Sequence, residues 1–150
     1  MDFRRAVGTD VSKIREAEEL IFSDAWSERS ISSAICTEGG ICFVAMEGDN
    51  LIAYVLGRLI APEGEIYRIA VLPEYRRRGI GYRLLDYAVK TSRGRGLECL
   101  FLEVRSKNLP ARKLYRAYGF KDMGIRRGYY MDPPDDAVIM LRAHSDDLKN

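Results

Sequence analysis

Two kinds of hydrophobic pattern alternate along this chain. Short runs rich in β-branched and aromatic residues are typical of strands, and longer stretches with apolar residues three to four positions apart are typical of packed helices. The runs predict strands at residues 3–7, 41–46, 51–60, 66–72, 97–104, 120–125 and 136–141. The stretches predict helices that begin near residues 10, 27, 80 and 108.

Residues that favour helix ends support these boundaries. Thr9 or Asp10 can cap the first helix, and Ser27 can cap the second. In the last helix, Asn108 stands at the cap position, Pro110 lies in the first turn and Gly119 follows the end.

The connections predict a mixed sheet. The segment 48–50, Gly-Asp-Asn, indicates a hairpin, so the sheet should start antiparallel. The helix after residue 80 allows a crossover between parallel strands. The apolar core from Cys99 to Leu102 predicts a strand covered on both faces, and a loop through residues 129–134 should separate the last two strands. We expect an α/β (α+β) fold with about seven strands and four helices, in one domain over residues 1–150 that ends in a polar tail at 144–150.

Composition excludes several classes of protein. The chain is 47% hydrophobic and 31% charged, as is typical of a globular domain. Lysine and arginine outnumber aspartate and glutamate by only 24 to 22, which argues against broad nucleic-acid binding. No run approaches the ~18 apolar residues of a membrane span, and no signal-type segment follows the N-terminus. We therefore expect a cytoplasmic protein with no direct nucleic-acid or membrane partner.

Cysteine and histidine also limit the chemistry. Cys36, Cys42 and Cys99 are odd in number and lack metal-type spacing, so they are predicted to be buried thiols. His144, the only histidine, lies near the C-terminus, so neither a histidine base nor a histidine metal site is expected.

The strongest chemical signal lies at 66–85, where a strand runs into Arg76-Arg77-Arg78-Gly79-Ile80-Gly81 and then into a helix. Pro73 ends the strand. The two glycines let the backbone approach a ligand, and the first N–H groups of a helix have no helical acceptor. Such a helix start binds phosphate, and the arginines add positive charge. The junction therefore suits a pyrophosphate.

Other interpretations of this junction are a solvated loop or a basic patch for nucleic acid. Two familiar phosphate motifs do not apply. The dinucleotide pattern G-x-G-x-x-G needs a third glycine where Leu84 stands, and the Walker loop needs a Gly-Lys-Ser/Thr that does not follow.

The motif Arg76-x-x-Gly79-x-Gly81 resembles the acetyl-coenzyme A (acetyl-CoA) signature Q/R-x-x-G-x-G/A of the GNAT N-acetyltransferase superfamily. The resemblance covers nearly the whole chain and is strongest to the bacterial ribosomal-protein alanine N-acetyltransferases. It is carried by Trp26-Ser27-Glu28, Ile69-Ala70-Val71, Leu102-Glu103-Val104-Arg105 with Asn108, Leu114-Tyr115 with Gly119-Phe120, and Arg126-Arg127-Gly128-Tyr129-Tyr130. It implies the GNAT fold, acetyl-CoA as cosubstrate and no metal.

The resemblance also implies a role for individual residues. Glu103 would be the general base, and Tyr115 the general acid that protonates the leaving thiolate. Tyr129 and Tyr130 would line the acceptor slot, and Phe22 and Trp26 are expected beside it from their position between the first two helices. The remaining implied residues would bind acetyl-CoA: Ile69, Ala70, Val71, Arg76, Arg77, Arg78, Gly79, Ile80, Gly81, Tyr82 and Asn108.

These roles are chemically reasonable, and each has a structural alternative. An N-terminal ammonium has a reference pKa of ~8, so a carboxylate need only assist its deprotonation, and a phenol at ~10 can protonate a thiolate at ~8.5. Alternatively, Glu103 is a solvated carboxylate paired with Arg105, Tyr115 and Trp26 are core aromatics, and Asn108 is only a helix cap.

Three functions are open at this point. The first is acetyl transfer from acetyl-CoA to a protein N-terminal α-amine, with the N-terminal alanine of a small-subunit ribosomal protein as acceptor. The second keeps the cofactor but takes a small-molecule amine or polyamine. The third is a non-catalytic acyl-CoA-binding module, against which Glu103 and Tyr115 argue.

Overall fold

The computed structural model describes residues 1–145 and contains one seven-stranded sheet in the order β1-β2-β3-β4-β5-β7-β6. The strands are β1 (Asp2–Arg5), β2 (Phe43–Glu47), β3 (Asn50–Ile60), β4 (Glu63–Val71), β5 (Cys99–Arg105), β6 (Lys121–Met131) and β7 (Pro134–Ala143). The helices are α1 (Val11–Ile21), α2 (Glu28–Cys36), α3 (Ile80–Arg93) and α4 (Leu109–Ala117), with 3-10 turns at Gly8–Asp10 and Pro73–Tyr75. The predicted fold class is confirmed.

The sheet is antiparallel from β1 to β4, parallel between β4 and β5, and antiparallel again through β7 and β6. The β2–β3 hairpin turns at residues 48–49, and α3 makes the crossover between the parallel strands, as the sequence predicted. Of the expected tail, 146–150 lie outside the described residues; His144 is still attached, because its N–H donates to the Glu98 carbonyl at 2.6 Å.

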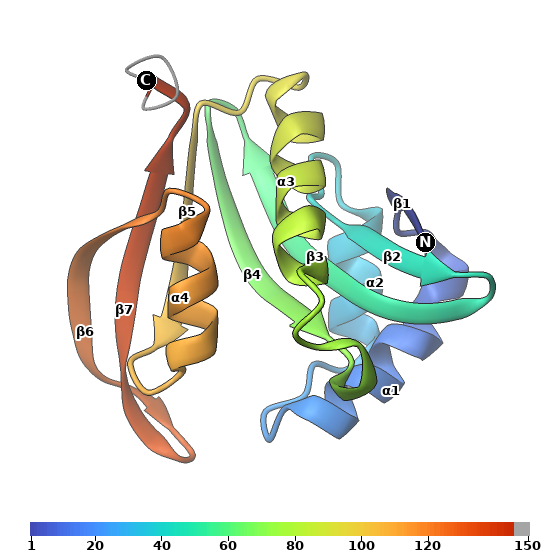
Figure 1. Cartoon of the computed structure of the whole chain (residues 1–150), viewed down its shortest axis with the longest axis horizontal. Coiled ribbons are helices and arrows are strands. Elements are labelled where there is room, and N and C mark those ends of the chain that lie inside the picture. Colours follow the sequence, from blue (N-terminus) through green and yellow to red (C-terminus); the bar gives the residue numbers. More distant parts are fainter. Residues whose placement is uncertain (146–150) are drawn as a thin grey trace.

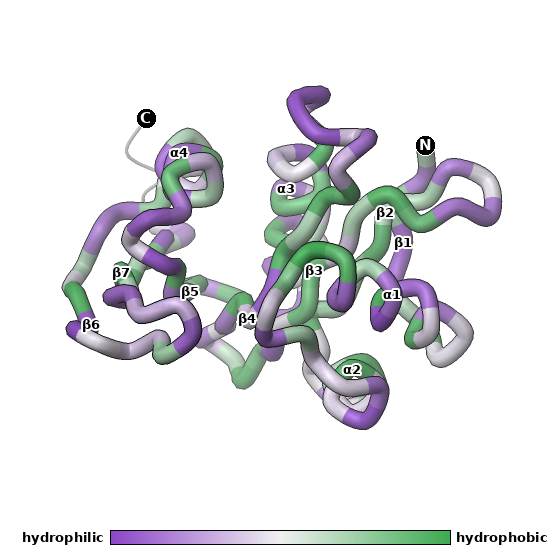
Figure 2. The backbone as a smooth tube through the Cα atoms, turned by 90° about the horizontal axis from the view of Figure 1, so that it is seen from below, coloured by the Kyte–Doolittle hydropathy of each residue, from purple (hydrophilic) through white to green (hydrophobic). Residues whose placement is uncertain are grey.

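Helices cover both faces of the sheet (Figure 1). Helices α3 and α4 lie on one face, and α1 and α2 lie on the other, as the perpendicular view in Figure 2 also shows. Each face has its own core. The α3 core includes Phe43, Leu84 and Leu102, and the α1–α2 core includes Ile14, Ile31 and Tyr54. Strand β3 contributes to both cores, which is why nearly all of it is buried.

Strands β4 and β5 separate towards one end, which opens the sheet (Figure 1). They pair only from Glu63–Ile66 to Cys99–Leu102. Beyond that point β4 continues along β3 to Val71, while β5 continues along β7 to Arg105. A bulge lies at the start of the opening, because Ile66 pairs with Gly57 and Arg68 with Leu56, which leaves Tyr67 without a partner on β3.

Three details of the prediction were wrong. Strand β5 alternates between buried and half-buried residues, so only the face towards α3 is fully covered. Strand β6 extends to Met131 and includes Tyr129 and Tyr130, which the sequence placed in a loop. Register shifts interrupt the alternation of apolar and polar residues along β6. The strand also lies exposed at the edge of the sheet, so its sequence lacks the apolar run by which a buried strand is recognised. Of the cysteines only Cys42 is buried, since Cys36 ends α2 on the surface and Cys99 is half-buried at the start of β5.

Candidate active site

The loop before α3 presents backbone N–H groups to solvent. Gly79, the cap of α3, has φ +73°, and Arg77 has φ +65°, the only positive value for a non-glycine within residues 1–145. The first helical hydrogen bond runs from Arg83 N–H to the Gly79 carbonyl at 3.1 Å. The N–H groups of residues 80–82 therefore lie before the helical ladder. Left-handed residues among right-handed ones turn successive N–H groups to one side, which makes an anion site.

The two glycines of the motif lie in different surroundings. A Cβ on Gly79 would meet no atom within 4 Å, so this face of the loop is open. A Cβ on Gly81 would lie 3.2 Å from Leu114 Cδ2 and 3.6 Å from Val71 Cγ2, so this glycine brings α3 close to α4 and β4. The backbone donors thus stand at an open surface beside the end of β4, and they fit the diphosphate of a coenzyme A molecule.

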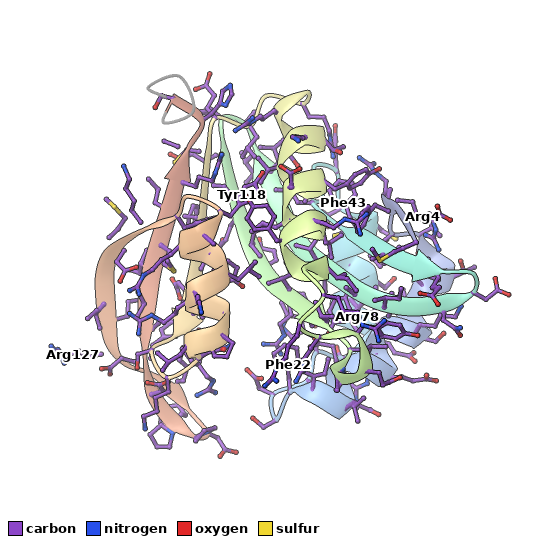
Figure 3. All side chains as sticks on the ribbon, in the orientation of Figure 1. Arg4, Phe22, Phe43, Arg78, Tyr118 and Arg127 are labelled. Atoms are coloured by element: carbon purple, nitrogen blue, oxygen red, sulfur yellow. The ribbon has the colours of Figure 1, made fainter. Side chains whose placement is uncertain are left out.

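Arginine side chains surround this loop. Arg76 Nε donates to the Val71 carbonyl at 3.1 Å, which ties the loop to the end of β4. The Arg78 guanidinium lies 5.5 Å from the centroid of the Tyr75 ring, and Figure 3 marks Arg78 on the loop that leads into α3. Arg76, Arg77 and Arg78 are all exposed, so their charges are available to a phosphate ligand.

The open side of β4 offers backbone groups that no neighbouring strand bonds. The Leu72 N–H donates to the Ile52 carbonyl of β3 at 2.9 Å. Because backbone direction alternates along a strand, the polar groups of Ile69 and Val71 point away from β3, into the opening towards β5. Ala70 directs its backbone to β3 and its side chain into the α1–α2 core. The Val71 carbonyl already accepts from Arg76 Nε, so of the three predicted residues the backbone of Ile69 and the N–H of Val71 can bind a ligand in the opening.

Glu103 lies on β5 just past the last rung that joins β4 and β5. Its side chain is 17% exposed, and its Oε1 lies 3.3 Å from Arg126 Nε. Arg105, the partner considered from the sequence, instead donates to the carbonyls of Pro133 (2.7 Å) and Asp132 (3.2 Å). Glu103 is thus a largely buried, ion-paired carboxylate at the opening, and the solvated alternative is wrong.

Tyr115 lies on α4, which covers the same face of the sheet as α3 (Figure 1). It is 6% exposed, and its ring centroid lies 5.7 Å from that of Phe120. Burial raises the pKa of its phenol, and the neighbouring Tyr130 adds to this shift. The phenol therefore keeps its proton at neutral pH, as a general acid must. The core-aromatic alternative also describes its packing, because one ring can do both.

A segment that we call the acceptor loop, residues 22–27 between α1 and α2, lies beside the opening. Its Trp26 ring is 5.9 Å from the ring of Tyr67, the bulged residue of β4. Its Ser23 hydroxyl donates to the Asp132 carbonyl in the β6–β7 turn at 3.4 Å. The acceptor loop and this turn therefore meet on the α1–α2 face of the sheet opening.

Tyr129 and Tyr130 come from β6 on the same face. The charge of Glu103 and a hydrogen bond with it raise the pKa of the Tyr129 phenol. Burial and the charge of Glu103 raise the pKa of Tyr130 to about 12. The Arg105 guanidinium lies 4.2 Å from the Tyr130 ring centroid. The structure thus gathers both tyrosines around Glu103, while Arg127 points away from the outer side of β6 (Figure 3).

Sequence reasoning missed one charged residue of the site, Glu65 on β4. It pairs with Phe101 across the last parallel rungs, so it shares a sheet face with Glu103, two residues further along β5. Burial and the negative charge of Glu103 raise the pKa of Glu65, and Arg126 partly opposes this shift. In the sequence, the only signal for Glu65 was its position directly before the strand predicted at 66–72.

Two further predicted cofactor residues, Asn108 and Tyr82, make contacts within the protein. The Asn108 side chain accepts a hydrogen bond from Ala111 N–H at 3.3 Å, so its capping role is confirmed. Tyr82 is 43% exposed, and its ring packs edge-on against Tyr118 at 5.2 Å. Their contact with a cofactor stays a prediction.

The part of the chain that the structure describes shows neither a metal site nor a membrane-spanning helix. Within residues 1–145, no group of three His, Cys, Asp or Glu side chains is arranged to hold a metal ion. None of the helices in this part of the chain is long and apolar enough to cross a membrane.

Comparisons with known proteins agree on one family. The profile of the Acetyltransferase (GNAT) family matches residues 11–120. The [ribosomal protein bS18]-alanine N-acetyltransferase of Escherichia coli K12 is 33% identical over 134 residues, covering 88% of this chain and 90% of that protein. The N-alpha-acetyltransferase RimI of Mycobacterium tuberculosis is 35% identical over 135 residues, covering 87% and 84%.

Solved structures agree with this family. The crystal structure of the E. coli ribosomal-protein-S18-alanine N-acetyltransferase superposes with a TM-score of 0.88 at 30% identity, covering 95% of this chain and 92% of that one. The structure of Ard1 from Thermoplasma volcanium superposes with a TM-score of 0.87 at 22% identity, which indicates a shared fold.

Proposed function

This chain belongs to the GNAT acetyltransferase family, and from that premise we propose that it acetylates the α-amine at a protein N-terminus, specifically the N-terminal alanine of a small-subunit ribosomal protein. It is an acetyl-CoA-dependent N-acetyltransferase. The choice of acceptor rests on its relatives, since several proteins about one third identical over most of the chain carry that activity in their names. A ribosomal acceptor also implies that the enzyme works in the cytoplasm.

One structural observation carries this proposal: Glu103 lies where β4 and β5 separate, with the loop before α3 on one face of the sheet and the loop 22–27 on the other (Figure 1). The anion site stands at the start of α3, and the backbone of Ile69 and the N–H of Val71 point into the opening. The acceptor loop and the β6–β7 turn meet over the opposite face. An extended chain terminus can enter such an opening more easily than a lysine on a folded surface.

The residues divide the chemistry among them. Acetyl-CoA, when bound, supplies an acetyl group activated as a thioester. The N–H groups of residues 80–82 and the nearby arginines hold its diphosphate, and the backbone of Ile69 and Val71 orients its arm. Backbone N–H groups directed into the opening also stabilise negative charge that develops on the acetyl oxygen.

Proton transfers complete the reaction. Glu103 accepts the proton of the attacking amine. Because the reference pKa of an N-terminal ammonium is ~8, its deprotonation at neutral pH costs little free energy. Arg126 and Tyr129 hold the Glu103 carboxylate in place. Tyr115, protonated at neutral pH, donates its proton to the leaving sulfur.

The proposal is tested by incubating the protein with acetyl-CoA and a peptide that begins with alanine, taken from a small-subunit ribosomal protein. We expect one acetyl group on the terminal amine, located by fragmentation mass spectrometry. The matched control is the same peptide with a blocked N-terminus and an internal lysine. Acetylation of the control, or only of polyamines in a parallel panel, would contradict the proposed acceptor; binding of acetyl-CoA without any transfer would favour a non-catalytic role.

A further inference from the structure

A buried carboxylate lies beneath the acceptor loop. Glu18, on the inner side of α1, is fully buried at 0% exposure. It accepts hydrogen bonds from the Tyr54 hydroxyl, from the Trp26 N–H at 2.9 Å and from Arg68 Nε at 3.1 Å. A buried charge is costly unless it is paired and hydrogen-bonded, so this degree of satisfaction indicates a defined arrangement.

Arg68 extends the network to the other half of the acceptor loop. Its side chain is 14% exposed, and its second terminal nitrogen donates to the Asp24 carbonyl at 2.8 Å and to the Asp24 carboxylate at 3.2 Å. Its guanidinium also lies 3.9 Å from the centroid of the Phe22 ring. One planar guanidinium therefore contacts both a strand-facing carboxylate and the loop, which a lysine could not do.

The network joins the acceptor loop to the part of β4 that opens. Arg68 precedes Ile69, whose backbone faces the opening, and it follows Tyr67, which the Trp26 ring contacts. The loop is not deeply buried, because Phe22 and Trp26 are half-buried, and Ser23 and Asp24 are exposed. The Trp26 carbonyl also accepts from the Arg15 guanidinium on α1.

We propose that Glu18 and Arg68 are positioning residues for the acceptor: as an ion pair they hold the acceptor loop, and Trp26 with it, against the bulge of β4 so that the slot keeps its shape. This inference rests on the proposed function, in which the slot receives a peptide N-terminus. Neither residue takes part in the proton transfers.

Two substitutions test the pair directly. Glu18→Gln keeps an acceptor for the Trp26 N–H but removes the charge that fixes Arg68. Arg68→Lys keeps a positive charge but cannot bond Glu18 and Asp24 together. Two controls match them. Glu16→Gln makes the same chemical change on the exposed side of α1. Tyr54→Phe removes a different hydrogen bond to Glu18 and leaves the contacts of the loop.

Trp26, the only tryptophan, reports the loop without an assay of activity. In Glu18→Gln and Arg68→Lys we expect stronger acrylamide quenching of its fluorescence. We also expect about a tenfold rise in the KM for the acceptor peptide, because each variant loses charge-assisted hydrogen bonds that hold the loop. The kcat at saturating peptide should change less than twofold, and so should the Kd for acetyl-CoA by calorimetry. Both controls should match the wild type in quenching and KM.

The outcomes separate the possibilities. Unchanged quenching and KM in both test variants would overturn the inference. An equal rise of KM in Tyr54→Phe would also overturn it, since the effect would then follow the general stability of the buried network. If the wild type acetylates no peptide, the proposed function fails, and the quenching result alone decides whether Glu18 and Arg68 hold the loop.

Discussion

Arg126 of β6 reaches across β7 to pair with Glu103 of β5, with 3.3 Å between Arg126 Nε and Glu103 Oε1. On the intervening strand β7, Ala137 is opposite Arg126 and Ile139 is opposite Glu103, so the ion pair runs diagonally across β7. The pair fixes a carboxylate at the point where β4 and β5 separate. This arrangement turns a strand-end glutamate into a candidate general base with a defined direction.

The first prediction concerns this carboxylate. Glu103→Gln should lower kcat at least about a hundredfold, because an amide cannot take a proton from the attacking amine. The Kd for acetyl-CoA should stay within about twofold, since the cofactor contacts that we propose come from α3 and β4. Steady-state kinetics and calorimetry measure the two quantities. Glu98→Gln, an exposed change just before β5, is the control, and an unchanged kcat in Glu103→Gln would remove the base assignment.

The second prediction separates two buried tyrosines, Tyr115 within α4 and Tyr118 directly after its end. Tyr115→Phe should lower kcat about tenfold or more, with little loss of stability, because no proton remains for the thiolate. Tyr118→Phe should cost about 1 kcal/mol of unfolding free energy without changing kcat, because the Tyr118 hydroxyl donates to Asp86 at 2.8 Å, between α4 and α3 (Figure 3). Equal kinetic effects in both variants would argue against Tyr115 as the acid.

The raised pKa of Tyr115 adds a pH dependence to this second prediction. Because burial shifts the pKa above the usual ~10, the phenol stays protonated well past neutral pH. The kcat of the wild type should therefore stay level up to about pH 9.5. A fall in this range that is absent in Tyr115→Phe would contradict the raised pKa of Tyr115. A pH–rate profile of both proteins checks this.

The third prediction uses two glycines with the same backbone strain. Gly79 (φ +73°) and Gly48 (φ +60°) both have open space where a Cβ would stand. Alanine at either position should cost about 1 kcal/mol of stability, since a side chain disfavours the left-handed region. Only Gly79→Ala should also weaken acetyl-CoA binding, by about tenfold or more, because Gly48 lies in the β2–β3 turn. Calorimetry on both variants measures the difference. Equal affinities for acetyl-CoA would contradict the assignment of the anion site before α3.

Local signals in the sequence predicted the helices well. Ser27 caps α2 by accepting from Ser30 N–H at 3.1 Å, and Asn108 caps α4 in the same manner. These caps are readable because the residue that bonds and the group it bonds lie three positions apart. The cap expected for α1 was wrong in detail, since Asp10 instead accepts from Arg4 (2.8 Å) and from Val7 N–H (2.8 Å).

Features made by distant strands were not readable. The bulge at Tyr67 depends on how β4 aligns with β3, and Gly57 shows why it lies there. A Cβ on Gly57 would approach the Glu65 carbonyl to 2.3 Å, so this contact is possible only with glycine. The pairing of Glu103 with Arg126 rather than Arg105 depends on the strand order β5-β7-β6, which no local pattern encodes.

The fourth prediction follows from Glu65, whose pKa is raised by burial and by the charge of Glu103. A carboxyl group with a raised pKa in the folded protein disfavours folding once it is ionised. At neutral pH the folded state therefore bears a cost that the unfolded state does not. Below the unfolded pKa of about 4.3 both states are protonated, and the cost disappears.

Glu65→Gln should thus be more stable than the wild type at pH 7, by less than about 1 kcal/mol because solvent screens a half-exposed group. The gain should shrink as the pH falls to about 4. Urea unfolding at both pH values measures it, with Glu63→Gln, exposed on the same strand, as the control. A gain of the same size at both pH values would mean that the charge of Glu65 is not its cause. A gain confined to neutral pH would show that the ionised carboxylate of Glu65 destabilises the folded protein, through its burial and the neighbouring charge of Glu103.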